Sequence, residues 1–169
     1  KFLNVWIFFL SIQLTGAYLG ASGFYKTHPR YFGYDSSPVL LQGPFLYLYV
    51  LLVLNKLSRL KPILFLHAIP FIFFTTYFVF KIHGAESPDL YQHIVNFLSD
   101  PSNFTIHVFG LFAHLHLIIY LILAIRLLRI HTKELPDEFS YTEGVNLKWL
   151  QNVINGITVI ALIIILGLL

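Results

Sequence analysis

The chain has 169 residues, of which 57% are hydrophobic and only 11% are charged, and its mean hydropathy is +0.73. A water-soluble domain of this size needs a larger polar surface than 11 Lys and Arg and 8 Asp and Glu provide. The composition excludes such a domain and indicates an integral membrane protein. Because cysteine is absent, a disulfide framework, a thiolate zinc site and a catalytic thiol are excluded too.

Long apolar runs divide the sequence, and each is the length of a membrane-crossing helix. Such a helix needs about 20 mostly apolar residues to cross the hydrocarbon core of a bilayer. We predict an all-α fold, a polytopic membrane helix bundle that forms one domain over residues 1–169. Its five transmembrane helices are predicted at residues 2–25, 37–55, 62–80, 104–128 and 147–169.

The longest connection between predicted spans contains apolar residues at roughly helical spacing. Leu90, Ile94 and Phe97 belong to this pattern within residues 89–98. The spacing predicts a short amphipathic helix that lies on the membrane surface.

The positive charges lie mostly on one side of this topology. That side carries Lys1, Lys56, Arg59, Lys61, Arg126, Arg129, Lys133 and Lys148, and the other side carries Lys26, Arg30 and Lys81. Positive connections tend to stay in the cytoplasm. We therefore expect residues 56–61 and 129–146 to be cytoplasmic. The net charge of +3 reflects this bias and not a nucleic-acid surface.

Three histidines fall within predicted spans, where an ionisable group is costly and often marks a site. They are His67, His114 and His116. One interpretation is neutral imidazoles that hydrogen-bond to neighbouring helices. The alternative is a membrane haem or redox protein in which His67 pairs with His114 or His116. No trusted metal-ligand spacing occurs, so we predict no metal site and no cofactor.

The second predicted span contains an unusual segment with Gly43, Pro44, Tyr47 and Tyr49. Proline removes a backbone donor, so the helix is expected to kink or begin there. Each tyrosine hydroxyl needs a partner in lipid. The segment is either a packed kink or the wall of a ligand cavity. We predict a ligand pocket from Gly43, Pro44, Tyr47, Tyr49, His67, His114 and His116.

A capping-box pattern precedes the last predicted span. Ser140 and Glu143 have the spacing with which a hydroxyl and a carboxylate cap a helix start, and Trp149 is placed at the membrane interface. With Asn146, they are candidates for signal relay or for a purely structural role.

No sequence motif suggests catalysis. No Asp or Glu falls inside a predicted span, which argues against a proton pump or a carboxylate-driven transporter. We predict that the chain is not an enzyme.

Two groups of motifs resemble a known family. The first is His28-Pro29, Gly43-Pro44 and the alternating Leu and Tyr of residues 46–49. The second is residues 138–143, followed by Asn146 and residues 147–150. Together they resemble the membrane-embedded N-terminal half of bacterial AraC-type transcriptional regulators, a module that also precedes some sensor kinases. The resemblance covers most of the chain.

The resemblance implies a location and a function. The five spans would be helices 2–6 of a seven-helix module in the inner (cytoplasmic) membrane of a bacterium. The chain would be a piece of a longer protein, in agreement with its lack of an initial methionine. The module would pass a signal from a small ligand or membrane partner to a cytoplasmic DNA-binding domain absent from this chain. A second copy, forming a homodimer, is a further candidate partner. A transporter or structural membrane subunit is the remaining alternative.

Overall fold

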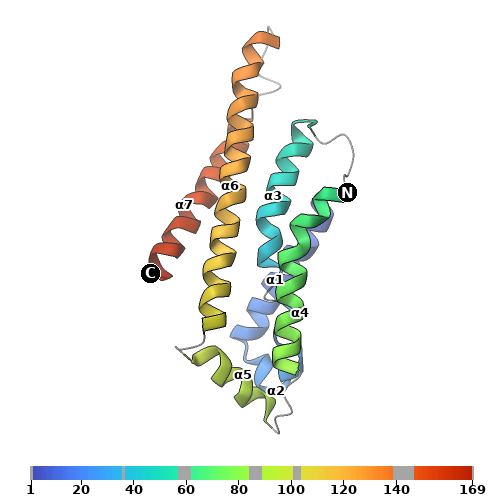
Figure 1. Ribbon diagram of the computed structural model, residues 1–169, viewed down its shortest axis with the longest axis vertical. Coiled ribbons are helices and arrows are strands. Elements are labelled where there is room, and N and C mark those ends of the chain that lie inside the picture. Colours follow the sequence, from blue (N-terminus) through green and yellow to red (C-terminus); the bar gives the residue numbers. More distant parts are fainter. Residues whose placement is uncertain are drawn as a thin grey trace. The chain divides into compact units, whose positions relative to one another are not determined.

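The structure is a computed structural model that describes residues 2–35, 37–56, 62–83, 89–100, 104–138 and 147–168. Every regular element within these ranges is a helix and none is a strand, which confirms the predicted all-α fold for them (Figure 1). The elements in chain order are α1 (Phe2–Ala21), α2 (Phe24–Thr27), the 3-10 helix η1 (Pro29–Tyr31), α3 (Val39–Val53), the 3-10 helix η2 (Pro62–Ala68), α4 (Ile69–His83), α5 (Leu90–Ser99), α6 (Phe104–Glu138) and α7 (Lys148–Leu168).

Two of these helices are long and apolar enough to cross a membrane. They are Phe2–Ala21 and the part of α6 from His107 to Thr132. Three further apolar helical stretches are shorter, namely Val39–Val53, Phe65–Lys81 and Lys148–Ile163. By helix length and composition, two of the five predicted spans are therefore supported.

Two predicted helix ends are wrong. The first helix ends at Ala21 and not at residue 25, because Gly23 adopts a φ of +77° and turns the chain into α2. The helix of the fourth span continues to Glu138, ten residues beyond the prediction. No glycine or proline occurs between Ala113 and Leu135, so the helix passes the predicted end, and Pro136 lies only in its last turn.

The prolines in the apolar helices have different positions. Pro44 lies inside α3, which begins five residues earlier at Val39, so the alternative that the helix begins at Pro44 is wrong. Pro70, expected inside a span, is the second residue of α4. Proline is well tolerated there because the first amides of a helix have no partner within the helix.

The chain divides into two compact units. The first comprises Lys1–Gln42 and Lys61–Gly110, and the second comprises Gly43–Leu60 and Leu111–Leu169.

The first unit has an aromatic core in which α5 takes part. The predicted amphipathic helix is confirmed as α5, which lies across the end of α4 (Figure 1). Ile94 on α5 and Phe78 on α4 are buried there, and the residues packed around them are Phe32, Phe74, Tyr77, Leu90, Phe97 and Phe109. The apolar face of α5 thus packs against protein.

In the second unit each helix buries apolar side chains. On α7 the buried residues Leu150, Ile154 and Ala161 share one helix face. On α3, directly after it and on α6, the buried side chains are those of Leu46, Leu48, Val50, Leu54, Ala113, Tyr120, Leu121, Ala124 and Leu128.

Candidate functional site

Part of the predicted tyrosine segment makes a close helix contact within the second unit. A Cβ atom added to Gly43 would lie 3.0 Å from Cβ and from Cδ2 of Tyr120 on α6. The absence of a side chain at residue 43 therefore lets α6 approach the backbone of α3 closely at this point.

Two of the predicted residues gather around this same tyrosine. The ring of Tyr47 lies 6.0 Å from that of Tyr120, and the ring of His116 lies 4.9 Å from it. His116 also stacks on Phe112 at 5.6 Å. Gly43, Tyr47 and His116 thus meet at Tyr120, a residue that the sequence did not single out.

The other predicted residues have separate positions. Pro44 is buried on α3, Tyr49 and His114 are half-buried in the second unit, and His67 is half-buried on η2 in the first unit. Trp149 is an exposed residue of α7. Ser140, Glu143 and Asn146, and with them the predicted capping box, lie outside the described residues; α7 begins at Lys148, next to the start predicted for the last span at residue 147. The pocket and the relay role stay predictions.

A cavity of about 470 Å³ lies beside α1 in the first unit. One face of α1 lines it, with residues at the three- and four-residue spacing of a single helix side: Phe8, Ser11, Ile12, Thr15, Gly16 and Leu19. The segment that follows α1 supplies the opposite wall, which contains Phe24, Tyr25, Tyr31, Tyr34 and Asp35.

Glycines allow the segment 24–35, which forms this second wall, to fold back against α1. Gly23 and Gly33 have φ values of +77° and +95°, which favour glycine and reverse the chain. A Cβ on Gly16 would overlap the side chain of Asp35, and a Cβ on Gly20 would lie 3.8 Å from the ring of Tyr25. The two helix glycines therefore form the surface on which Asp35 and Tyr25 pack.

Only part of the hydrogen-bonding capacity of the Asp35 carboxylate is used. The hydroxyl of Tyr25 donates a hydrogen bond to it, and the other carboxylate oxygen, Oδ1, is buried and has no hydrogen-bond partner among the residues that the structure describes. Tyr25 lies outside the candidate spans. Burial raises its pKa above the ordinary 10.0, and the neighbouring charge and hydrogen bond of Asp35 raise that pKa further. Tyr25 thus stays a neutral donor.

Aromatic rings surround the mouth of this cavity. Phe24 stacks on His28 at 4.4 Å with an angle of 7° between the rings, and it also lies 6.0 Å from Tyr31. The ring of Tyr25 meets that of Phe32 edge to face at 5.3 Å. Tyr31 and Tyr34 are more than half exposed, which places them at the rim.

A polar network holds α1 against the start of α3. The indole of Trp6 donates to Oε1 of Gln42 at 2.7 Å, and the Gln42 amide donates to Oε1 of Gln13 at 3.1 Å. These bonds fix the helix that carries the cavity wall to the residues that follow Asp35.

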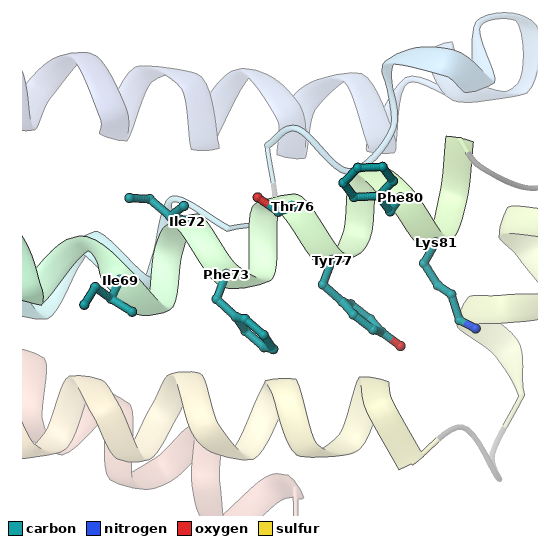
Figure 2. Close-up of a pocket in the computed structure, with 7 residues that line it drawn as sticks. All are labelled: Ile69, Ile72, Phe73, Thr76, Tyr77, Phe80 and Lys81. Atoms are coloured by element: carbon teal, nitrogen blue, oxygen red, sulfur yellow. The ribbon is translucent and has the colours of Figure 1, made fainter.

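A second cavity, of about 650 Å³, runs along α4 and is almost wholly apolar. Figure 2 shows Phe73, Tyr77 and Lys81 projecting on one side of the helix, and Ile72, Thr76 and Phe80 on the other. Ligand sites combine an apolar wall with a few converging polar groups. The wall of the cavity beside α1 is also mostly apolar, but it includes the carboxylate of Asp35 and more hydroxyl groups than the cavity along α4, so it meets that description better.

The sequence carries one signal for this site. Asp35 is the only acidic residue before Glu86, and it follows glycines spaced by four on an apolar helix. No Asp or Glu lies inside a predicted span, yet this carboxylate contacts one at Gly16. Whether a loop residue contacts a helix depends on the path that the chain takes between them. The local sequence pattern does not reveal that path.

Among the described residues, no group of three His, Cys, Asp or Glu side chains is placed to hold a metal ion. Comparisons of the chain with models of known families, with curated proteins and with solved structures find no match. The resemblance to membrane-embedded regulators therefore rests on the sequence motifs alone.

Proposed function

We propose that this chain is the membrane-embedded sensory module of a bacterial transcriptional regulator. It crosses the inner membrane five times, with residues 56–61 and 129–146 in the cytoplasm. A small ligand binds within the helices, and the signal passes to a cytoplasmic DNA-binding domain. The observation that carries the proposal is the cavity beside α1, lined by the half-buried Asp35 with its buried Oδ1 atom, in a chain whose helices expose apolar surface.

The exposed side chains support a lipid environment. Phe65 and Phe80 are each 73% exposed, and Phe104 is 78% exposed. So much exposed apolar surface is a liability in water and fits the acyl chains of a bilayer. The shorter apolar stretches in α3, α4 and α7 complete the proposed five crossings.

The proposed orientation places the cavity on the outer side, where α1 ends. Gly16 precedes the end of α1 by five residues, which corresponds to roughly 8 Å along a helix. A ligand arriving from outside the cell would therefore meet Asp35 at a shallow depth.

Ligand binding acts as a signal only if it favours one arrangement of helices over another. The ligand would close the segment 24–35 onto α1, and α1 is tied to Gln42 at the start of α3. A shift of α1 would therefore move Gln42 and with it the start of α3.

The test is whether the complete gene product regulates transcription from the membrane. We would express it with an affinity tag in a bacterial host, crosslink the chromatin and sequence the recovered DNA. The expected result is enrichment of a few promoters whose transcripts change when the gene is deleted. Recovery no greater than from untagged cells, with no change in transcripts, would overturn the proposal.

The same strain compares the two candidate pockets. If the cavity beside α1 is the sensory site, Asp35→Asn abolishes the transcriptional response to cell extracts, whereas Tyr47→Phe and His114→Ala retain it. The reverse pattern would assign the ligand to the pocket predicted from the sequence. An absorption spectrum with a Soret band would favour the haem alternative.

A further inference from the structure

We propose that the cavity beside α1 binds a small organic cation, an amine with an apolar body, whose ammonium group pairs with Asp35. This inference names the ligand class of the site used above and rests on the proposed function for the ligand's role as a signal. The binding itself requires no regulatory output.

The carboxylate of Asp35 has an oxygen that accepts no hydrogen bond from the described residues. Tyr25 donates one hydrogen bond to Asp35, but Oδ1 is buried and accepts none from the described part of the chain. A buried acceptor without a donor costs free energy, and a buried charge costs more unless an opposite charge lies beside it. The described residues that line the cavity include no lysine, arginine or histidine. Within the described lining, the negative charge of Asp35 therefore has no basic side chain beside it.

Aromatic rings line the cavity beside Asp35. Phe24, Tyr31 and Tyr34 border the same cavity as Asp35. The faces of aromatic rings attract cations, and aromatic side chains with a carboxylate are a recurrent way to bind substituted ammonium groups. A small inorganic cation would instead need several oxygen ligands, which one carboxylate and scattered hydroxyls do not supply.

The size and the apolar wall of the cavity beside α1 suit a small organic molecule. The volume of about 470 Å³ falls in the range of small-molecule sites and far exceeds that of a water molecule. Phe8, Ile12 and Leu19 provide an apolar wall along α1. A ligand with an ammonium group at one end and an apolar body at the other matches both parts of this lining.

The experiment uses three probes of similar shape that differ in charge: 2-phenylethylamine, 2-phenylethanol and phenylacetate. Each is titrated calorimetrically into the complete gene product in lipid nanodiscs, and empty nanodiscs correct for partition into lipid. We expect the amine to bind about 10- to 100-fold more tightly than the alcohol, and the anion not to bind, because a charge-assisted hydrogen bond contributes that much. Equal binding of amine and alcohol would overturn the inference.

Two variants locate the binding. Asp35→Asn keeps the shape of the side chain and should remove the preference for the amine while leaving alcohol binding within about threefold. Asp100→Asn removes the same charge elsewhere in the first unit and should change nothing. If Asp35→Asn retains the preference, the inference is wrong.

A rim variant covers the case in which Asp35→Asn does not fold. Tyr31 is 61% exposed, so Tyr31→Leu should fold normally and weaken the amine more than the alcohol. An unchanged ratio of affinities in Tyr31→Leu would then overturn the inference. Amine binding without promoter binding would instead overturn the proposed function alone.

Discussion

Single glycines decide where segments distant in sequence approach helix backbones. Gly16 accommodates Asp35, Gly20 faces Tyr25, and Gly43 faces Tyr120. In a membrane, where water provides no driving force between helices, close approach at small residues supplies much of the packing energy. These glycines therefore have packing roles, and the site beside α1 depends on two of them.

Replacing Gly43 by alanine should destabilise the second unit. The new Cβ would lie 3.0 Å from two atoms of Tyr120, so α3 and α6 must move apart. We expect a loss of about 1–3 kcal/mol in the free energy of unfolding, as for other overpacked contacts. Titration with a denaturing detergent, followed by circular dichroism, measures it.

Gly156→Ala is the matched control for Gly43→Ala. Gly156 also lies in a helix of the second unit, and nothing is within 4 Å of its added Cβ. Alanine there should leave stability unchanged or raise it by up to about 1 kcal/mol. Equal effects of the two substitutions would show that the contact with Tyr120 does not matter.

The hydrogen bond of Tyr25 makes stability depend on alkaline pH. Because its pKa is raised in the folded state, its contribution is fully present below pH 10.0 and is lost as the pH rises through the folded-state value. We expect the unfolding free energy of the wild type to fall faster between about pH 9.5 and pH 11.5 than that of Tyr25→Phe. Parallel curves for the two proteins would contradict this assignment.

At the scale of elements, α5 shows how local sequence fixes a helix. Asp89 precedes α5, and its Oδ1 accepts the backbone amide of Gln92 at 3.0 Å. Asp100 follows the helix, where its own backbone amide closes the last turn. The amphipathic pattern and the cap agree, and this helix was correctly predicted.

Asp89→Ala should loosen the start of α5. Losing an N-cap costs about 1 kcal/mol, so amide hydrogen exchange in the first turn should become about fivefold faster. Asp100→Ala should leave that exchange unchanged, because the cap at Asp100 uses the backbone. Exchange that is equally fast in both variants would mean that the Asp89 side chain does not cap α5.

Helix ends were harder to predict than helices. Apolar runs located the two long and the three shorter apolar helices, but the end of α1 depended on Gly23, and α6 continued into charged sequence to Glu138. Charged residues have good helix propensity, so a change in composition marks the edge of a membrane and need not mark the end of a helix.

At the scale of the whole molecule, the proposed topology can be tested directly. The chain has no cysteine, so single-cysteine variants need no prior substitutions. In intact cells, a membrane-impermeant maleimide should label Thr27→Cys and Gln92→Cys and should not label Lys56→Cys or Glu134→Cys. Labelling in the opposite pattern would reverse the orientation and close the cavity beside α1 to ligands from outside.

The sequence alone determined that this protein is a chain of apolar helices. Composition and apolar run length depend on each residue's own preference for lipid or water, so they can be recognised without a structure. The tertiary structure decided which side chains meet. Asp35 reaches Gly16 only because two glycine turns fold the segment back onto α1, and Tyr120 reaches Gly43 only because α6 packs on α3. Such contacts join residues far apart in the sequence, where periodicity and local motifs carry no information about distance.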